Sequence, residues 1–227
     1  MESADMKNEM VSWFSELKDH QTPEWDSLPD LDLYMDQVIT YLERQMRVFT
    51  QDGEDKLITP SMINNYVKNE IIPRPSKKKY SRDHLAYLLA ISMLKQVLPI
   101  TDISNIIKHQ TGYMDMEEFY NRFRTIQDDT LHVTAQRVEE EILAEKNDSF
   151  NNRDALGMLA FKLTFEASSS ILAAKKIIRM LTAEDKEHDD QEKDDKKKKN
   201  GSDSKSEKKK KNSHDNRDEK KENTDLM

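Results

Sequence analysis

The chain has 227 residues, of which 35% are hydrophobic and 35% charged, and its formal net charge is −8. With only 4 Gly and no Cys, this composition favours a helical protein with a modest core and excludes disulfides, thiolate nucleophiles and Cys-bound zinc. No uninterrupted apolar run approaches the roughly 18 residues of a membrane span, and the N-terminus has no basic segment followed by an apolar core, so we expect a cytoplasmic protein with no membrane partner.

The first 50 residues predict two amphipathic helices. The first ends before the sequence QTPEW, and the second begins near Asp30 and ends at the loop 50–53. Apolar residues recur at steps of three and four in the first helix, and the second has an apolar side. They are Met6, Met10, Trp13, Phe14 and Leu17 in the first helix, and Leu33, Val38, Tyr41 and Leu42 in the second.

A short third helix is predicted over residues 60–69. Thr59 can cap its free amides, Pro60 fits its first position, and Pro73 requires it to end nearby. Its outer face carries no carboxylate, and Asn can pair with adenine while Ser and Lys can bond base edges or phosphates. Helical spacing directs Ile63, Tyr66 and Val67 to the core, and Ser61, Asn64, Asn65 and Lys68 to the opposite face.

Positive charge is concentrated around this helix in an otherwise acidic protein. Residues 59–95 contain 7 Lys and Arg against 2 Asp and Glu, whereas residues 1–58 contain 5 against 14. The segment 73–82 is too rich in Pro for a helix, so we expect a stiff wing that carries positive charge to phosphates. Within this wing Tyr80 can pack inward or bond a phosphate. The alternative for the whole surface is a solvated loop and a polar helix face. The wing's candidate contacts with DNA, which include Tyr80 in the second of its two options, are Arg74, Lys77, Lys78, Lys79, Tyr80 and Arg82.

Two helices are predicted to follow the wing. Ser81 can cap a helix that runs to Pro99 and is apolar on nearly every side, so this helix should be the buried centre of the domain. A shorter helix restarts at Thr101 and ends at Gly112.

The C-terminal half predicts long helices and then a change in composition. Residues 114–147 form one helix, or two with a break near Asp128, and residues 153–182 form another. Residues 183–227 are almost devoid of apolar side chains, which predicts a disordered charged tail.

The order of these elements resembles the winged helix-turn-helix of the mercury-resistance-regulator (MerR) class. The stretch MINNYVKNEIIPRP…YSRDHLAYLLAISMLKQVLPITDI follows that class through its second helix, wing, third helix and short fourth helix. The words LPDLDLYMDQVITYL, NNYVK, PRP and KKYSRDHLA are together similar to an uncharacterised family of Gram-positive bacteria, the domain of unknown function number 1836, over roughly residues 28–145. This resemblance implies a bacterial DNA-binding regulator.

Residue by residue, the resemblance to the MerR class is partial. Tyr66 and Lys68 match the aromatic and basic residues of the class's recognition helix. Asn64 and Asn65 replace the Arg and the first Tyr that are usual there, and Glu70 replaces the usual turn Gly. The base-reading pattern of the class therefore does not transfer directly.

The helix over 153–182 is a candidate for homodimerisation. Small residues permit close approach of a second helix, and an apolar seam accompanies them. Packing onto its own domain is the rival interpretation, and a small-molecule effector pocket is a further possibility that no residue marks. The small residues are Ala160, Ala167, Ser170 and Ala174, and the seam is Leu156, Leu163, Ile177 and Leu181.

We expect no catalytic residues, no cofactor and no metal site. The sequence has no Gly-rich phosphate loop, no G-x-S-x-G and no H-E-x-x-H, and its six His have no ligand spacing. The acidic run lacks the Gly and Glu that a calcium loop requires. This run is Asp26, Asp30, Asp32 and Asp36.

The sequence thus predicts an all-α protein with four segments. They are an N-terminal helix and linker (1–27), a winged helix-turn-helix domain (28–110), a helical oligomerisation or sensor segment (111–182) and a disordered tail (183–227). The predicted function is transcription regulation by a homodimer that reads double-stranded DNA through the helix 60–69 and the wing 73–82. The alternative is an adaptor that binds an acidic protein through the same basic surface.

Overall fold

The computed structural model describes residues 3–50, 57–144 and 155–183, so the predicted tail lies almost wholly outside the described residues. By compactness the chain divides into residues 1–178 and residues 179–227, and of the second unit only the helical residues 179–183 are described. The fold class is all-α, as predicted. In the described part of the chain the only β pairings are two isolated bridges.

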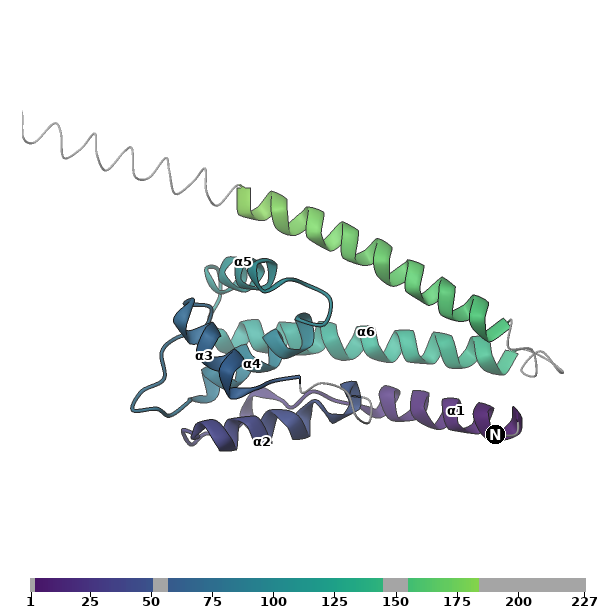
Figure 1. Cartoon of the computed structure of the whole chain (residues 1–227), viewed down its shortest axis with the longest axis horizontal. Coiled ribbons are helices and arrows are strands. Elements are labelled where there is room, and N and C mark those ends of the chain that lie inside the picture. Colours follow the sequence, from purple (N-terminus) through teal and green to yellow (C-terminus); the bar gives the residue numbers. More distant parts are fainter. Residues whose placement is uncertain (1–2, 51–56, 145–154, 184–227) are drawn as a thin grey trace, which may run out of the picture. The chain divides into compact units, whose positions relative to one another are not determined.

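The helices follow the order predicted from the sequence (Figure 1). The helices over Pro60–Lys68 and Arg82–Leu94 begin directly after the expected caps Thr59 and Ser81, because capping acts locally. The expected start of the second helix near Asp30 is wrong, because this helix begins only at Met35, with Tyr34 as its N-cap. Leu33 therefore lies outside the helix, and its backbone pairs with Tyr80. The expected extent of the fourth helix to Pro99 is also wrong, since it ends at Leu94. The α-helices are α1 (Ser3–Asp19), α2 (Met35–Gln45), α3 (Pro60–Lys68), α4 (Arg82–Leu94), α5 (Ile100–Thr111), α6 (Met116–Ala144) and a last helix, Ala155–Ala183. Short 3-10 turns, η1 (Trp25–Ser27) and η2 (Arg47–Phe49), flank α2.

Helix α4 is the centre of the main hydrophobic core. Its side chains are buried on every side, as its all-round apolar pattern predicts. The surrounding helices supply one apolar face each, for example Val38 and Leu42 from α2 and Ile63 and Tyr66 from α3. The fully buried residues of α4 include Leu85, Leu88, Leu89 and Ile91.

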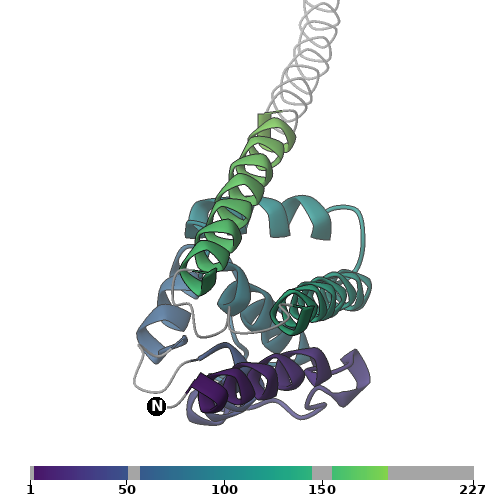
Figure 2. The same ribbon diagram turned by 90° about the vertical axis from the view of Figure 1, so that its right-hand side faces the viewer.

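A second, smaller core joins α1 to α6, which lie side by side in Figures 1 and 2. Phe14 and Leu17 of α1 pack with Val138 and Ile142 of α6. An ion pair between Lys18 and Glu139 closes the edge of this contact. Residues from the predicted segments 1–27, 28–110 and 111–182 therefore share one compact unit.

Helix α6 is continuous, so the alternative with a break near Asp128 is not realised. Asp128 instead accepts hydrogen bonds from the backbone N–H and the hydroxyl of Thr22, at 3.1 and 2.7 Å. About two turns nearer the start of α6, the buried Tyr120 hydroxyl donates to the carbonyl of Pro23 at 2.8 Å. These bonds fix the linker between α1 and α2 along α6.

The helix Ala155–Ala183 packs through one face onto its own domain. Leu159 and Leu163 join the smaller core, and Ile178 is buried in the main one. Leu163, expected in a dimer seam, therefore takes the rival role of intramolecular packing. By length and composition alone this is the one helix among those described that could cross a membrane, although Lys162 and Glu166 interrupt its apolar sequence.

A strained residue terminates α3. The N–H of Ile71 bonds the carbonyl of Tyr66 at 2.9 Å and the N–H of Glu70 bonds that of Val67 at 3.2 Å, which is the Schellman arrangement. This motif places its C′ residue in the left-handed region, where Gly is usual, and here Glu70 has φ of 54°. A side chain at this φ costs roughly 1–2 kcal/mol.

We expect Glu70→Gly to stabilise the fold by about 1 kcal/mol, because Gly adopts this φ without the clash of a Cβ. Urea unfolding followed by circular dichroism measures the change. Glu70→Ala is the matched control, since it removes the carboxylate but keeps the Cβ, and it should give no comparable gain. An equal gain from both substitutions would mean that the charge of Glu70, and not its backbone, is unfavourable.

Candidate nucleic-acid interface

Helix α3 presents to solvent the polar face that its spacing predicts. Ile63 and Tyr66 are buried in the main core, and this orients the opposite side of the helix outward. The N-cap is formed as expected, with the Thr59 hydroxyl accepting from the N–H of Met62 at 3.2 Å. The four predicted outer residues, Ser61, Asn64, Asn65 and Lys68, are all exposed.

The two adjacent Asn residues of α3 are not equivalent. The side-chain amide of Asn69 donates to Oδ1 of Asn65 at 2.8 Å and also to its backbone carbonyl at 2.9 Å. Among the described residues Asn64 has no such partner. Asn64 therefore keeps both its donor and its acceptor available, whereas Asn65 is tethered to the end of its own helix.

The basic segment, residues 73–82, makes a tight turn at its tip. The N–H of Lys79 bonds the carbonyl of Ser76 at 2.9 Å, and the two residues form an antiparallel bridge. The residues between them, Lys77 and Lys78, have φ of 50° and 65°. Two successive positive φ angles are the requirement of a type I′ turn, which normally takes Asn-Gly. The backbone at Lys77 and Lys78 is therefore strained.

The end of the basic segment is anchored in the core. The backbone of Tyr80 pairs with that of Leu33, through N–H to carbonyl bonds of 2.8 and 2.9 Å. The Tyr80 side chain is only 3% exposed. It therefore packs inward, and its expected contact with a phosphate is wrong because the ring is enclosed by the main core.

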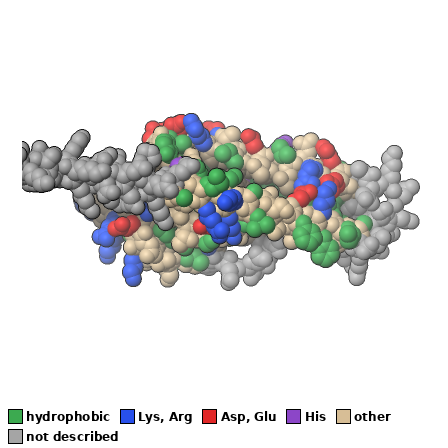
Figure 3. Space-filling model, turned by 90° about the horizontal axis from the view of Figure 1, so that it is seen from above, with side chains coloured by type: hydrophobic (Ala, Val, Ile, Leu, Met, Phe, Trp, Pro, Cys, Tyr) green, Lys and Arg blue, Asp and Glu red, His purple; other side chains and the backbone are tan. Residues whose placement is uncertain are grey.

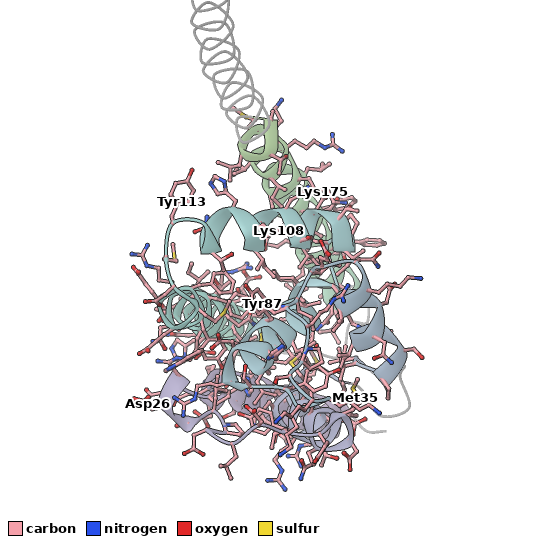
Figure 4. The ribbon with its side chains drawn as sticks, turned by 90° about the vertical axis from the view of Figure 1, so that its left-hand side faces the viewer. Asp26, Met35, Tyr87, Lys108, Tyr113 and Lys175 are labelled. Atoms are coloured by element: carbon pink, nitrogen blue, oxygen red, sulfur yellow. The ribbon has the colours of Figure 1, made fainter. Side chains whose placement is uncertain are left out.

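Arg82 is also engaged within the protein. Its guanidinium lies over the ring of Trp25, 5.6 Å from the centroid, and 3.7 Å from the carboxylate of Asp26. Asp26 lies at the surface (Figure 4). Arg82 thus joins η1 to the start of α4, and we remove it from the candidate phosphate contacts. Lys79 is partly engaged, with its ammonium 5.1 Å from the ring of Tyr34.

The remaining cations of the surface are uncommitted. In the ranges 3–50, 57–144 and 155–183, no ion pair involves Lys68, Arg74, Lys77 or Lys78. The exposed Glu70, two residues beyond the end of α3, places a carboxylate beside this surface. The surface therefore carries positive charge without ion-pair partners among the described residues, on the side of the basic segment.

His84 lies beneath the basic segment at the start of α4. Its Nδ1 accepts the N–H of Ser81 at 3.1 Å, and its ring meets that of Tyr80 edge-on at 5.5 Å. Its Nε2 is buried without a hydrogen-bond partner in the described structure. Burial lowers the pKa of His84, and the nearby carbonyl of Pro73 and carboxylate of Asp83 offset only part of this effect. Sequence patterns do not reveal this capping role, because His is not a common partner in a capping box.

The connection before α3 differs from a simple helix-turn-helix. That motif joins its two helices by a turn of about 3–4 residues. Here the chain leaves α2 at Met46, forms η2, and reaches the cap of α3 only at Thr59. Helices α2 and α3 nevertheless pack together.

A comparison with models of known protein families finds the family that the sequence motifs resemble. Residues 23–123, from the linker before α2 to the first turns of α6, match the model of a domain of unknown function, DUF1836. This match supports an uncharacterised domain family for that segment. No curated protein and no solved structure matches the chain.

We expect the double substitution Lys77→Asn with Lys78→Gly to stabilise the fold by about 1–2 kcal/mol, because Asn-Gly adopts the positive φ angles of this turn with little strain. Chemical unfolding measures the gain. The control is Lys77→Ala with Lys78→Ala, which removes both charges but keeps both Cβ atoms. A gain from the Ala pair of the same size would show that charge repulsion, and not backbone strain, destabilises the turn.

We expect the free energy of unfolding to decrease as the pH falls through about 6.5, the ordinary pKa of His. The folded-state pKa of His84 is lowered by burial, so between the two pKa values the unfolded chain binds a proton that the folded chain does not. His84→Gln, which stays neutral and can still accept the Ser81 amide, should flatten this slope. His20, whose pKa burial also lowers, accounts for the slope that remains. An unchanged slope in His84→Gln would contradict this assignment.

Proposed function

We propose that the protein is a transcription regulator that binds double-stranded DNA through α3 and the basic segment. In this proposal the outer face of α3 enters the major groove and the lysines of the turn contact the neighbouring phosphates. The proposal retains the predicted contacts Ser61, Asn64, Asn65, Lys68, Arg74, Lys77, Lys78 and Lys79.

The observation that carries the proposal is the strained Lys77-Lys78 turn. An Asn-Gly pair would form the same turn with less strain. Non-Gly residues with positive φ persist where the surrounding structure holds them, and they concentrate at functional sites. The side chains of Lys77 and Lys78 add positive charge at the tip of an anchored loop, and a polyanion is the ligand that such charge attracts.

The dimensions and chemistry of α3 suit the major groove. Its 9 residues span about 13 Å, and the groove is about 12 Å wide. The free amide of Asn64 can donate to N7 and accept from N6 of adenine, which is the pairing that distinguishes this base. Positively charged loops beside such a helix fix the register on the duplex.

An acidic protein partner is the alternative ligand for the same charges. It would use Lys77 and Lys78 equally well, but it would give Asn64 no role in choosing among DNA sequences. Loss of the Asn64 amide therefore distinguishes the two functions, because it changes the preference among DNA sequences only if the protein reads DNA.

We expect selection from a random duplex pool to yield a preferred site, and Asn64→Ala to lose about 1–3 kcal/mol of discrimination at one base pair. Asn65→Ala should lose less, because its Oδ1 already accepts a bond from Asn69. Fluorescence anisotropy against the selected site and single-base variants measures both. Equal loss of affinity for every duplex in Asn64→Ala would contradict base reading by α3.

We expect Lys77→Asn with Lys78→Gly to weaken binding to all duplexes alike and to reduce the slope of log affinity against log salt by up to about 2, since each lost phosphate contact contributes about 0.9. Weaker binding by a more stable protein cannot be attributed to unfolding. No binding of the unmodified chain to any duplex at micromolar concentration and 50 mM salt, together with binding to an acidic polypeptide such as polyglutamate, would favour the adaptor.

A further inference from the structure

The helix Ala155–Ala183 has a second apolar face, opposite to the one that packs on its own domain. Met158, Phe161, Phe165 and Leu172 are 62, 62, 68 and 69% exposed. They follow steps of three, four and seven residues, which places them on one stripe. Figure 3, taken from the side on which this helix lies in Figure 1, shows hydrophobic side chains exposed along it. Ser168 and Lys175 occupy the two remaining heptad positions of the stripe.

We propose that this stripe pairs antiparallel with the same stripe of a second copy of the chain. A two-fold axis that crosses the helix between Glu166 and Ala167 makes the stripe self-complementary. Phe165 then faces Ser168 of the second copy, Phe161 faces Leu172, and Met158 faces Lys175. Each contact occurs twice.

Residue sizes favour this orientation over a parallel one. The antiparallel arrangement places the large Phe165 ring against the small Ser168, so that ring and gap fit each other. It also places the Lys175 stem along Met158, with its ammonium free to reach water. A parallel pair would oppose Phe165 to Phe165, Ser168 to Ser168 and Lys175 to Lys175, with a void in one layer and like charges in another.

The contacts within each copy hold the helix ready for this pairing. Glu166 accepts a hydrogen bond from Arg137 at 2.7 Å, and Lys162 donates to Glu141 at 2.7 Å, so α6 binds both charged residues in the middle of the helix. The pKa of Glu141 is lowered chiefly by its hydrogen bond from Lys162. Insertion into a bilayer would break these pairs and the packing of Leu159 and Leu163, whereas pairing with a second copy leaves them intact.

The area is sufficient for a dimer. Aromatic side chains bury about 150–250 Å² each when fully covered. Two Phe, one Leu and one Met per copy, about two-thirds exposed, therefore supply roughly 1,000 Å² in total from two copies, which is the lower limit of a specific interface. This stripe is a different face from the seam that the sequence suggested, and the inference does not depend on DNA binding.

The first experiment is sedimentation velocity of the full chain over a range of concentrations, without DNA. We expect a dimer, and Phe161→Ser with Phe165→Ser should raise its dissociation constant at least about 100-fold, as the loss of central aromatic contacts does. The matched control is Ile126→Ser with Val133→Ser, which removes two equally exposed apolar residues of α6. Dissociation by the control and not by the Phe pair would overturn the proposal.

The second experiment tests the relative orientation of the two paired helices. Because the chain has no native Cys, only the introduced Cys residues can form disulfides. Met158→Cys and Lys175→Cys proteins, carrying different tags, are mixed and oxidised. The antiparallel pairing predicts a mixed disulfide and no disulfide within either protein alone, because like positions lie about 25 Å apart. Disulfides formed by each protein alone, without the mixed species, would show a parallel pair.

A third outcome concerns lipid. If the unmodified chain is monomeric at all concentrations and floats with vesicles of neutral and anionic phospholipids, the stripe faces a membrane and the dimer proposal is wrong. A monomer that does not float is equally contrary to the proposal. Circular dichroism of each variant confirms that the helices are retained.

Discussion

The burial of α4 on all sides is the constraint on which the rest of the domain depends. A helix without a polar face must be surrounded, and α2, α3, α5 and α6 each contribute an apolar face to surround it. Once Ile63 and Tyr66 are committed to this core, the polar side of α3 can only face solvent. The candidate interface therefore follows from the hydrophobic core, and its orientation is set by residues that would never touch a ligand.

The basic segment shows how the same core supports local strain. The left-handed turn at Lys77 and Lys78 is enclosed between Pro75 and Tyr80, and Tyr80 is fixed to Leu33 by two backbone hydrogen bonds and by burial of its ring. Strained backbone persists when surrounding contacts determine it. His84, at the start of α4, lies beneath the segment, where it accepts the N–H of Ser81 and contacts the ring of Tyr80. The charges of the turn are thus carried on a loop whose end is anchored in the core.

Helix α6 contacts the main core, the smaller core, the linker between α1 and α2, and the last helix. It packs against α4 in the main core, forms the smaller core with α1, fixes the linker through Asp128 and Tyr120, and binds Glu166 and Lys162 of the last helix. Because one face of the last helix is used in this way, its opposite face is left apolar and uncovered. A single long helix therefore sets the geometry of the domain and leaves exposed the face that we propose to pair with a second copy.

Sequence alone determined that these helices exist, their order, the buried centre and the outer face of α3, because apolar spacing and capping at Thr59 and Ser81 act over a few residues. Tertiary structure decided the features that depend on distant partners. It paired the backbone of Tyr80 with Leu33 and engaged Arg82 with Trp25 and Asp26. It also bonded Asn65 to Asn69, and Asp128 of the continuous α6 to Thr22. Tertiary structure also decided which face of the last helix packs inward. Leu163 and Phe165 are both apolar, but only Leu163 lies on the side that packs on the smaller core, whereas Phe165 is exposed.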